Sequence, residues 1–220
     1  MSFGGFNTND FSYFIGNRDS AIRETIKEKI TELSSILYES IPNNIRKYLK
    51  KPHIGKFSVT SDSLWFSIRP IQYDGAENIN YNFDICKKGL RYCLNAETMK
   101  AIKILKRPIS NNRNEFLRLA NIIDKNEIWV YERILSHRPS GSHMPGDPQE
   151  WKRIAYYNRT LNSEDLDNIL TKISRLKHSA VRIGQFYNKD DATATSQQLP
   201  EYLVELTKTY YKLFKFLNNL

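Results

Sequence analysis

Polar and apolar residues alternate through three runs of the sequence between residues 64 and 95. In the first run, Leu64, Phe66 and Ile68 alternate with polar or amphipathic residues. The second run covers residues 78–85, and the third covers residues 90–95 after a Lys-Lys-Gly turn. A period of two predicts β-strands that bury one face and turn the other towards solvent or a polar cover. The polar positions include three charged residues that we take as candidate binding residues: Arg69, Asp84 and Arg91.

A different period predicts the helices. Apolar residues spaced three and four apart predict a long amphipathic helix over residues 19–41, which Pro42 ends. Asn95 is a candidate N-cap for a helix that stops before Pro108, and further helices are expected over 112–123, 163–176 and 200–220. Shorter alternating runs predict strands at 127–135 and 180–187, and the polar stretch 188–198 is expected to be mobile. The sequence therefore predicts one α+β domain over residues 1–220, with an antiparallel sheet of four or five strands and helices on one face.

The charge is the unusual feature of the composition. The 220 residues contain 33 Lys and Arg against 24 Asp and Glu, for a formal net charge of +9. Such an excess favours a polyanionic partner, above all nucleic acid, although a lysine-rich surface that keeps the protein soluble accounts for it equally well. A basic connector follows the first long helix, and we take Lys50, Lys51 and Lys56 in it as candidate binding residues.

Cysteine usage and hydropathy indicate the compartment. Cys86 and Cys93 lie out of register on either side of the predicted turn, so reduced thiols are expected rather than a disulfide. The N-terminus lacks a basic segment followed by an apolar one, and no window approaches 18 apolar residues. We therefore expect a cytoplasmic protein without a membrane partner.

The segment from 136 to 149 is rich in Pro and Gly, and it is longer than most loops. Long ordered loops often carry binding residues, so Arg138 and His143 are candidates, while the alternative is a plain solvated connection. Glu150-Trp-Lys152, with Asp147 or Glu132 as the partner carboxylate, also has the spacing of a Mg²⁺-dependent nuclease or phosphate-ester hydrolase. No pair of cysteines accompanies the loop histidines, so no metal site and no cofactor are expected outside this hydrolase alternative.

Basic segments at 46–56, 103–107 and 172–182 are interleaved with tyrosine and tryptophan, including Tyr156. Aromatic side chains beside cations suit single-stranded nucleic acid, in which bases stack and phosphates pair with cations. The alternative is that the aromatic residues belong to the core and that the charges cover solvated faces.

Both ends of the chain resemble known sequences. Phe6, Asp10, Phe11 and Phe14, followed by Arg18 and a long helix, resemble the start of YktB-like bacterial proteins, and the closing Phe214-Lys-Phe-Leu-Asn resembles the end of related α+β families. The basic, proline-containing central signature of the YktB-like group has no counterpart here. The resemblance implies an α+β fold and no particular activity.

Three functional hypotheses follow. The first is a binding protein for a polyanion, most of all nucleic acid. The second is the hydrolase that would use Asp147, Glu150 and Lys152. The third is a protein-interaction module that acts through the aromatic C-terminal helix. The sequence leaves open whether the protein is an enzyme.

Overall fold

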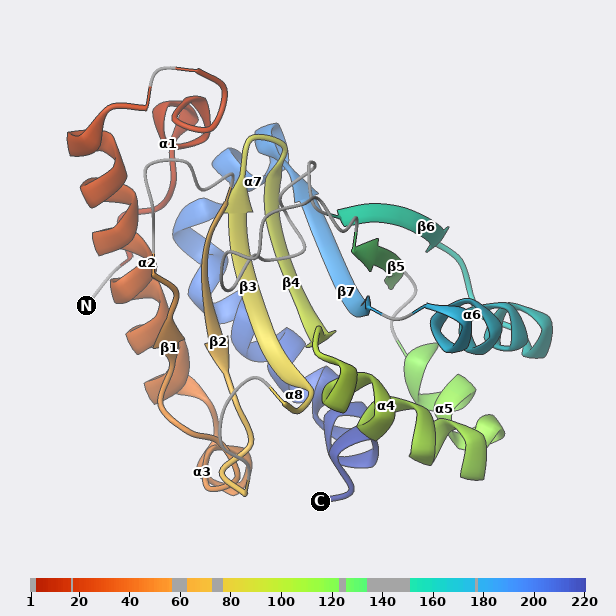
Figure 1. Cartoon of the computed structure of the whole chain (residues 1–220). Helices are drawn as coiled ribbons and strands as arrows, with labels where there is room; N and C mark the ends of the chain where they lie inside the picture. The colour runs from red at the N-terminus through yellow and green to blue at the C-terminus, as the bar shows by residue number, and fades with distance from the viewer. Residues whose placement is uncertain are drawn as a thin grey trace. The chain divides into compact units, whose positions relative to one another are not determined.

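The computed structural model describes residues 3–16, 18–56, 63–72, 77–122, 126–133, 151–176 and 178–220 (Figure 1). The helices are α1 (Thr8–Ser12), α2 (Ser20–Ser40), α3 (Asn43–Arg46), α4 (Met99–Asn111), α5 (Arg113–Ala120), α6 (Ser163–Arg175), α7 (Lys189–Ala194), the 3₁₀ helix η1 (Ser196–Gln198) and α8 (Leu199–Asn218). The strands are β1 (His53–Ile54), β2 (Ser63–Ile68), β3 (Asn80–Cys86), β4 (Gly89–Ala96), β5 (Glu127–Arg133), β6 (Trp151–Tyr157) and β7 (Ser179–Asn188).

The fold is α+β, as predicted, but the sheet is larger than predicted. It has seven strands in the order β1-β2-β3-β4-β7-β5-β6, not four or five. The five predicted strands are all present, and β1 and β6 are the additional ones. Both are the outermost strands of the order, where a strand pairs on one side only.

The chain comprises two compact units. Unit 1 contains residues 1–69, 81–92 and 186–208, and unit 2 contains residues 70–80, 93–185 and 209–220.

In unit 1, the alternation in the sequence has the predicted phase. Phe66 pairs with Phe83 across β2 and β3, and their rings stack with centroids 5.1 Å apart. Both side chains are fully buried, and α2 packs against β2. On the same face, the Tyr92 hydroxyl lies 2.6 Å from the Thr207 hydroxyl of α8. The apolar face of the sheet in this unit is therefore covered by helices, as expected.

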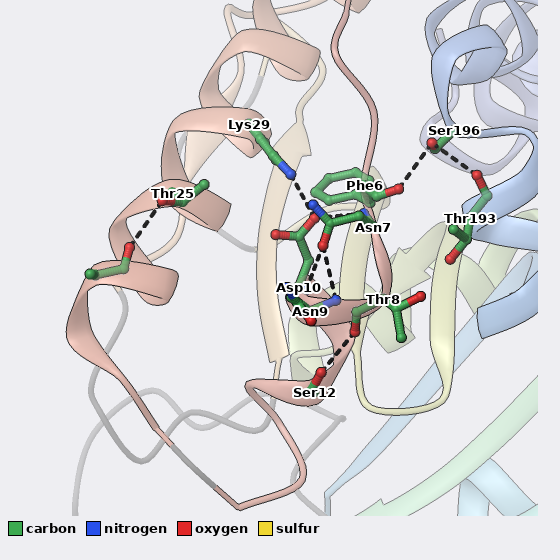
Figure 2. A network of polar contacts seen from close by, with 11 residues as sticks. Phe6, Asn7, Thr8, Asn9, Asp10, Ser12, Thr25, Lys29, Thr193 and Ser196 are labelled. Atoms are coloured by element: carbon green, nitrogen blue, oxygen red, sulfur yellow. Dashed lines mark hydrogen bonds and ion pairs between the residues drawn. The ribbon is translucent and has the colours of Figure 1, made fainter.

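The N-terminal segment is tied to two other parts of unit 1 (Figure 2). Asp10 is buried, and its carboxylate accepts hydrogen bonds from the backbone N–H of Asn7 and from the Lys29 ammonium of α2, each 2.7 Å long. The backbone carbonyl of Phe6 accepts a hydrogen bond of 3.0 Å from the Ser196 hydroxyl. These contacts hold α1 between α2 and η1.

The polar face of the central strands is also buried, although alternation alone would allow it to be solvated. In unit 1, three of its polar side chains are at most 2% exposed: Ser67, Asn82 and Asp84. Burial of polar groups is costly unless they form hydrogen bonds, so this face is the part of the molecule in which a function is most readily sought.

Unit 2 is built around β5, β6 and the helices α4, α5 and α6. The strand β5 pairs with β7 and with β6, and a register shift falls between Val130 and Tyr131. Asn218 at the end of α8 exchanges hydrogen bonds with the backbone of Ile79, at 3.1 and 3.2 Å. The Tyr210 hydroxyl donates a hydrogen bond to the Asn126 side chain. Polar side chains thus anchor the C-terminal half of α8 within this unit.

Four local predictions need correction. Thr98, not Asn95, caps α4, because Asn95 is still part of β4. This helix continues through Pro108 to residue 111. The proline costs the helix one hydrogen bond, and burial of Ile109 in the extra turn offsets that loss. The helix expected over 112–123 ends at Ala120. Residues 188–198, expected to be mobile, form α7 and η1, and Asn188 caps α7.

No helix in the described part of the chain is long and apolar enough to cross a membrane.

Candidate functional site

The basic connector runs alongside β2 at one edge of the sheet. The backbone N–H of Lys50 donates a hydrogen bond of 2.8 Å to the carbonyl of Arg69, and the N–H of Gly55 donates one of 3.1 Å to the carbonyl of Trp65. Between these two bonds, His53 pairs with Ser67 in the ladder. Residues 50–55 are therefore fixed along residues 65–69. We define the edge cluster as Lys50, Lys51, His53, Lys56, Trp65 and Arg69.

Charge in this region is of one sign. The described residues 41–56 and 63–69 include six Lys and Arg and no Asp or Glu. Arg46 pairs with Glu39 of α2, at 2.8 Å. Lys51 and Lys56 are exposed, and Lys50 and Arg69 are half-buried. Like charges that are brought together raise the local positive potential, which favours an anionic partner.

The pKa of His53 reports on this environment. It lies below the ordinary value of 6.5, because partial burial disfavours the charged imidazolium and the positive charges of Arg69 and Lys56 add to the effect. A nearby anion would act in the opposite direction. The imidazole is therefore a group whose charge couples to whatever binds at this edge.

An aromatic pair accompanies the cations. The rings of His53 and Trp65 lie 5.8 Å apart, and Trp65 is half-buried while His53 is exposed. A Cβ atom at Gly55 would collide with the Trp65 indole, so the absence of a side chain at this position lets the indole lie against the backbone. Neither His53 nor Trp65 was predicted as a site residue. The available signal was the Pro52-His-Ile-Gly55 sequence, in which the flanking residues leave room for only a two-residue strand.

Asp84 and Arg91, two of the predicted binding residues, bind each other. The Arg91 guanidinium donates two hydrogen bonds to the Asp84 carboxylate, at 2.9 and 3.1 Å. The Asp84 side chain is only 3% exposed and that of Arg91 only 11%, so the two form a buried, bidentate ion pair between β3 and β4. Burial and the negative charge of Asp84 raise the pKa of the nearby Cys86 thiol, with Arg91 opposing them. A protonated thiol is a poor nucleophile, so this group does not suggest catalysis.

The remaining predicted residues belong to the loop and to the strand after it. Asp147, Glu150, Arg138 and His143 lie outside the described residues. Lys152 is exposed on β6 and pairs with Glu132 of β5 in the ladder. Among the residues that the structure describes, no three His, Cys, Asp or Glu side chains are grouped closely enough to hold a metal ion.

The basic segments on α4 and α6 meet within unit 2. The Lys106 ammonium of α4 donates a hydrogen bond of 2.8 Å to the Ser174 hydroxyl of α6. Part of the charge there is neutralised, since Arg113 pairs with Asp167 and Arg118 pairs with Glu115. Arg182 is buried on β7 and adds nothing to the exposed charge. This surface is therefore less one-sided in charge than the edge cluster.

Comparison of the sequence with known proteins gives no information on function, so a functional proposal depends on the geometry of the site. No family model matches the chain, and no curated protein is significantly similar to it. The resemblance of the termini to YktB-like proteins remains a prediction.

Proposed function

We propose that the protein binds a polyanion, in the first instance nucleic acid, through the edge cluster of unit 1. The observation that carries the proposal is the composition of this edge. Exposed Lys51 and Lys56 flank an exposed histidine, and the described segments 41–56 and 63–69 contain no carboxylate. Asp84, which pairs with Trp65 across the ladder, is neutralised by Arg91. Phosphate groups are the ligand that such an edge would neutralise, with release of counterions from the nucleic acid.

The aromatic pair supports nucleic acid over other polyanions. Proteins that bind single strands combine a basic groove with aromatic rings on which bases stack. Trp65 and His53 bring aromatic surface into the same cluster as the cations. A surface that served solubility alone would gain nothing from an aromatic pair fixed beside its lysines.

A salt titration tests the proposal. Fluorescence anisotropy would measure the affinity for a labelled single strand and for a duplex over a range of salt concentrations. Replacement of Lys50, Lys51 and Lys56 by alanine should weaken binding and reduce the slope of log affinity against log salt by about 2, since each phosphate contact contributes roughly 0.7–0.9.

A matched control separates location from net charge. Lys27, Lys100 and Lys208 are also exposed, and each pairs with a glutamate elsewhere on the surface. Their replacement by alanine changes the net charge by the same amount and should leave the salt slope nearly unchanged. Equal losses in the two triple variants would contradict the proposed location, and no binding to DNA or RNA at low salt would contradict the function.

A further inference from the structure

Three basic residues form one strip on the surface of α4 in unit 2. Lys103 and Arg107 are exposed and four residues apart, so their side chains are neighbours on the helix. Lys106 lies beside them, half-buried, and its ammonium donates the 2.8 Å hydrogen bond to the Ser174 hydroxyl of α6. The next residue of α6, Arg175, is also exposed. We define the helix cluster as Lys103, Lys106, Arg107 and Arg175.

Two contacts show how α6 runs past this strip. Lys106 meets Ser174, and Arg113, seven residues later in the chain, pairs with Asp167, seven residues earlier. The helix α6 is therefore antiparallel to the segment that continues from α4 into α5, and its C-terminal end lies beside the middle of α4. Two basic segments that are 68 residues apart in the sequence thus meet on one surface.

The helix cluster has no negative charge within its own helices to balance it. The sequence of α4 contains no Asp or Glu, and the last carboxylate of α6 is that of Asp167, which pairs with Arg113. Within the described part of the chain, no ion pair joins a residue of the helix cluster to a carboxylate. The charge that this surface presents is therefore purely positive.

Other cations of unit 2 are neutralised. Like charges three and four residues apart on a helix repel one another and cost stability. Lys103, Lys106 and Arg107 are spaced in this way before the last turn of α4, where the helix dipole offers little compensation. A partner that supplies negative charge would remove the repulsion. Three exposed cations nearby already have such a partner within the protein: Lys100 pairs with Glu77, Arg113 with Asp167 and Arg118 with Glu115.

The composition of the two helices defines the kind of contact. Neither α4 nor α6 contains an aromatic residue, so neither offers a ring on which a base could stack. Cations alone recognise phosphates, which carry the same charge in every sequence.

We propose that the helix cluster is a second nucleic-acid contact, which holds the phosphate backbone and does not read bases. The inference rests on the proposed function for the nature of the polyanion. It adds a site in unit 2 to the edge cluster of unit 1, and it assigns the two sites different roles, since the edge cluster combines its cations with an aromatic pair.

A charge-removal variant of the full chain tests this contact. Lys103, Arg107 and Arg175 are replaced by alanine, which favours helices, and Lys106 is kept because its hydrogen bond joins the two helices. Fluorescence anisotropy with a labelled oligothymidylate should show that the slope of log affinity against log salt falls by about 2, since each phosphate contact of a single strand contributes roughly 0.7.

An abasic strand of the same length and charge provides a second readout. The variant should lose affinity for this strand by the same factor as for oligothymidylate, because both strands carry the same phosphates. The ratio of the two affinities should therefore stay at its wild-type value.

A control variant in the same unit separates location from net charge. Replacement of Lys100, Arg113 and Arg118 by alanine removes three cations that already pair with carboxylates. It should reduce the salt slope by less than about 0.5. Circular dichroism and a thermal unfolding transition would show that both triple variants are folded.

The outcomes separate this inference from the proposed function. An unchanged salt slope in the helix-cluster variant, or an equal loss in the control, overturns the helix cluster and leaves the edge cluster standing. A changed ratio between the strands with and without bases overturns a contact limited to the backbone. No binding of the wild-type protein to either strand at low salt overturns the proposed function and this inference together.

Discussion

Adjacent positions on β2 provide a test of the strand phase on which the core of unit 1 depends. Phe66 is fully buried and stacks on Phe83 with an angle of 17° between the ring planes. Phe66→Ala should therefore cost about 3–5 kcal/mol of folding free energy, because the ring is lost and a cavity remains. Ser67 is 2% exposed, yet its hydroxyl has no hydrogen bond to any residue that the structure describes. Ser67→Ala should change the free energy of unfolding by less than about 0.5 kcal/mol, or should raise it slightly.

A urea titration followed by circular dichroism would measure both effects. With an m value of about 2 kcal/mol per molar urea, Phe66→Ala should lower the midpoint by about 2 M, and Ser67→Ala should leave it almost unchanged. The m values of the variants should match that of the wild-type protein, which would show that only stability has changed. Equal losses, or a larger loss for Ser67→Ala, would mean that the strand phase is reversed and that Ser67 does not lie on the polar face.

Charged and aromatic groups near β2 provide three further tests. Arg91→Met leaves the Asp84 carboxylate buried without its guanidinium and should cost about 3–5 kcal/mol, whereas the Asp84→Asn/Arg91→Met double variant should lose less than the sum of the single changes. Additive losses in urea titrations would refute this coupling. The pKa of His53 lies below 6.5, so the folded state should lose stability relative to the unfolded state as the pH falls through that value. A bound phosphate would raise the pKa of His53, so the affinity for an oligonucleotide should rise as the pH falls from about 8 to about 5. The affinity of His53→Ala should rise less over the same range. An identical pH profile in the two proteins would count against the site. Gly55→Ala should displace the Trp65 indole, which predicts a red shift in tryptophan emission and weaker binding of strands with bases; an unaltered spectrum would show that the indole does not depend on this glycine.

The alternation of side chains was sufficient to predict the central strands, because burial on one face leaves a clear period of two. It was not sufficient for β1, which has only two residues between Pro52 and Gly55. Its ladder pairing with β2 makes it a strand, and a two-residue segment has no measurable period. The strand β6 was not predicted from the sequence for a related reason. It pairs with β5 where the register shifts, so polar and apolar side chains do not follow a simple alternation there.

The candidate site shows the same limit. The sequence placed Arg69, Asp84 and Arg91 together on one face, but it did not show which of them pair. Asp84 and Arg91 meet because the turn between β3 and β4 sets the register of the hairpin. The buried Ser67 hydroxyl and Asn82 Oδ1 have no hydrogen bond among the described residues. The sequence could not have shown this, since hydrogen bonding depends on the folded neighbourhood and not on residue type.

The bond between Ser196 and Phe6 has a consequence for synthesis of the protein. It joins residues 190 positions apart, and Tyr92 meets Thr207 across 115 positions in the same unit. Unit 1 thus cannot complete its core until the chain as far as Thr207 has left the ribosome. Until then, the apolar face of β3 and β4 lacks its α8 cover, and contacts of such long range form slowly. We therefore expect nascent or C-terminally shortened chains to depend on chaperones far more than the finished protein does.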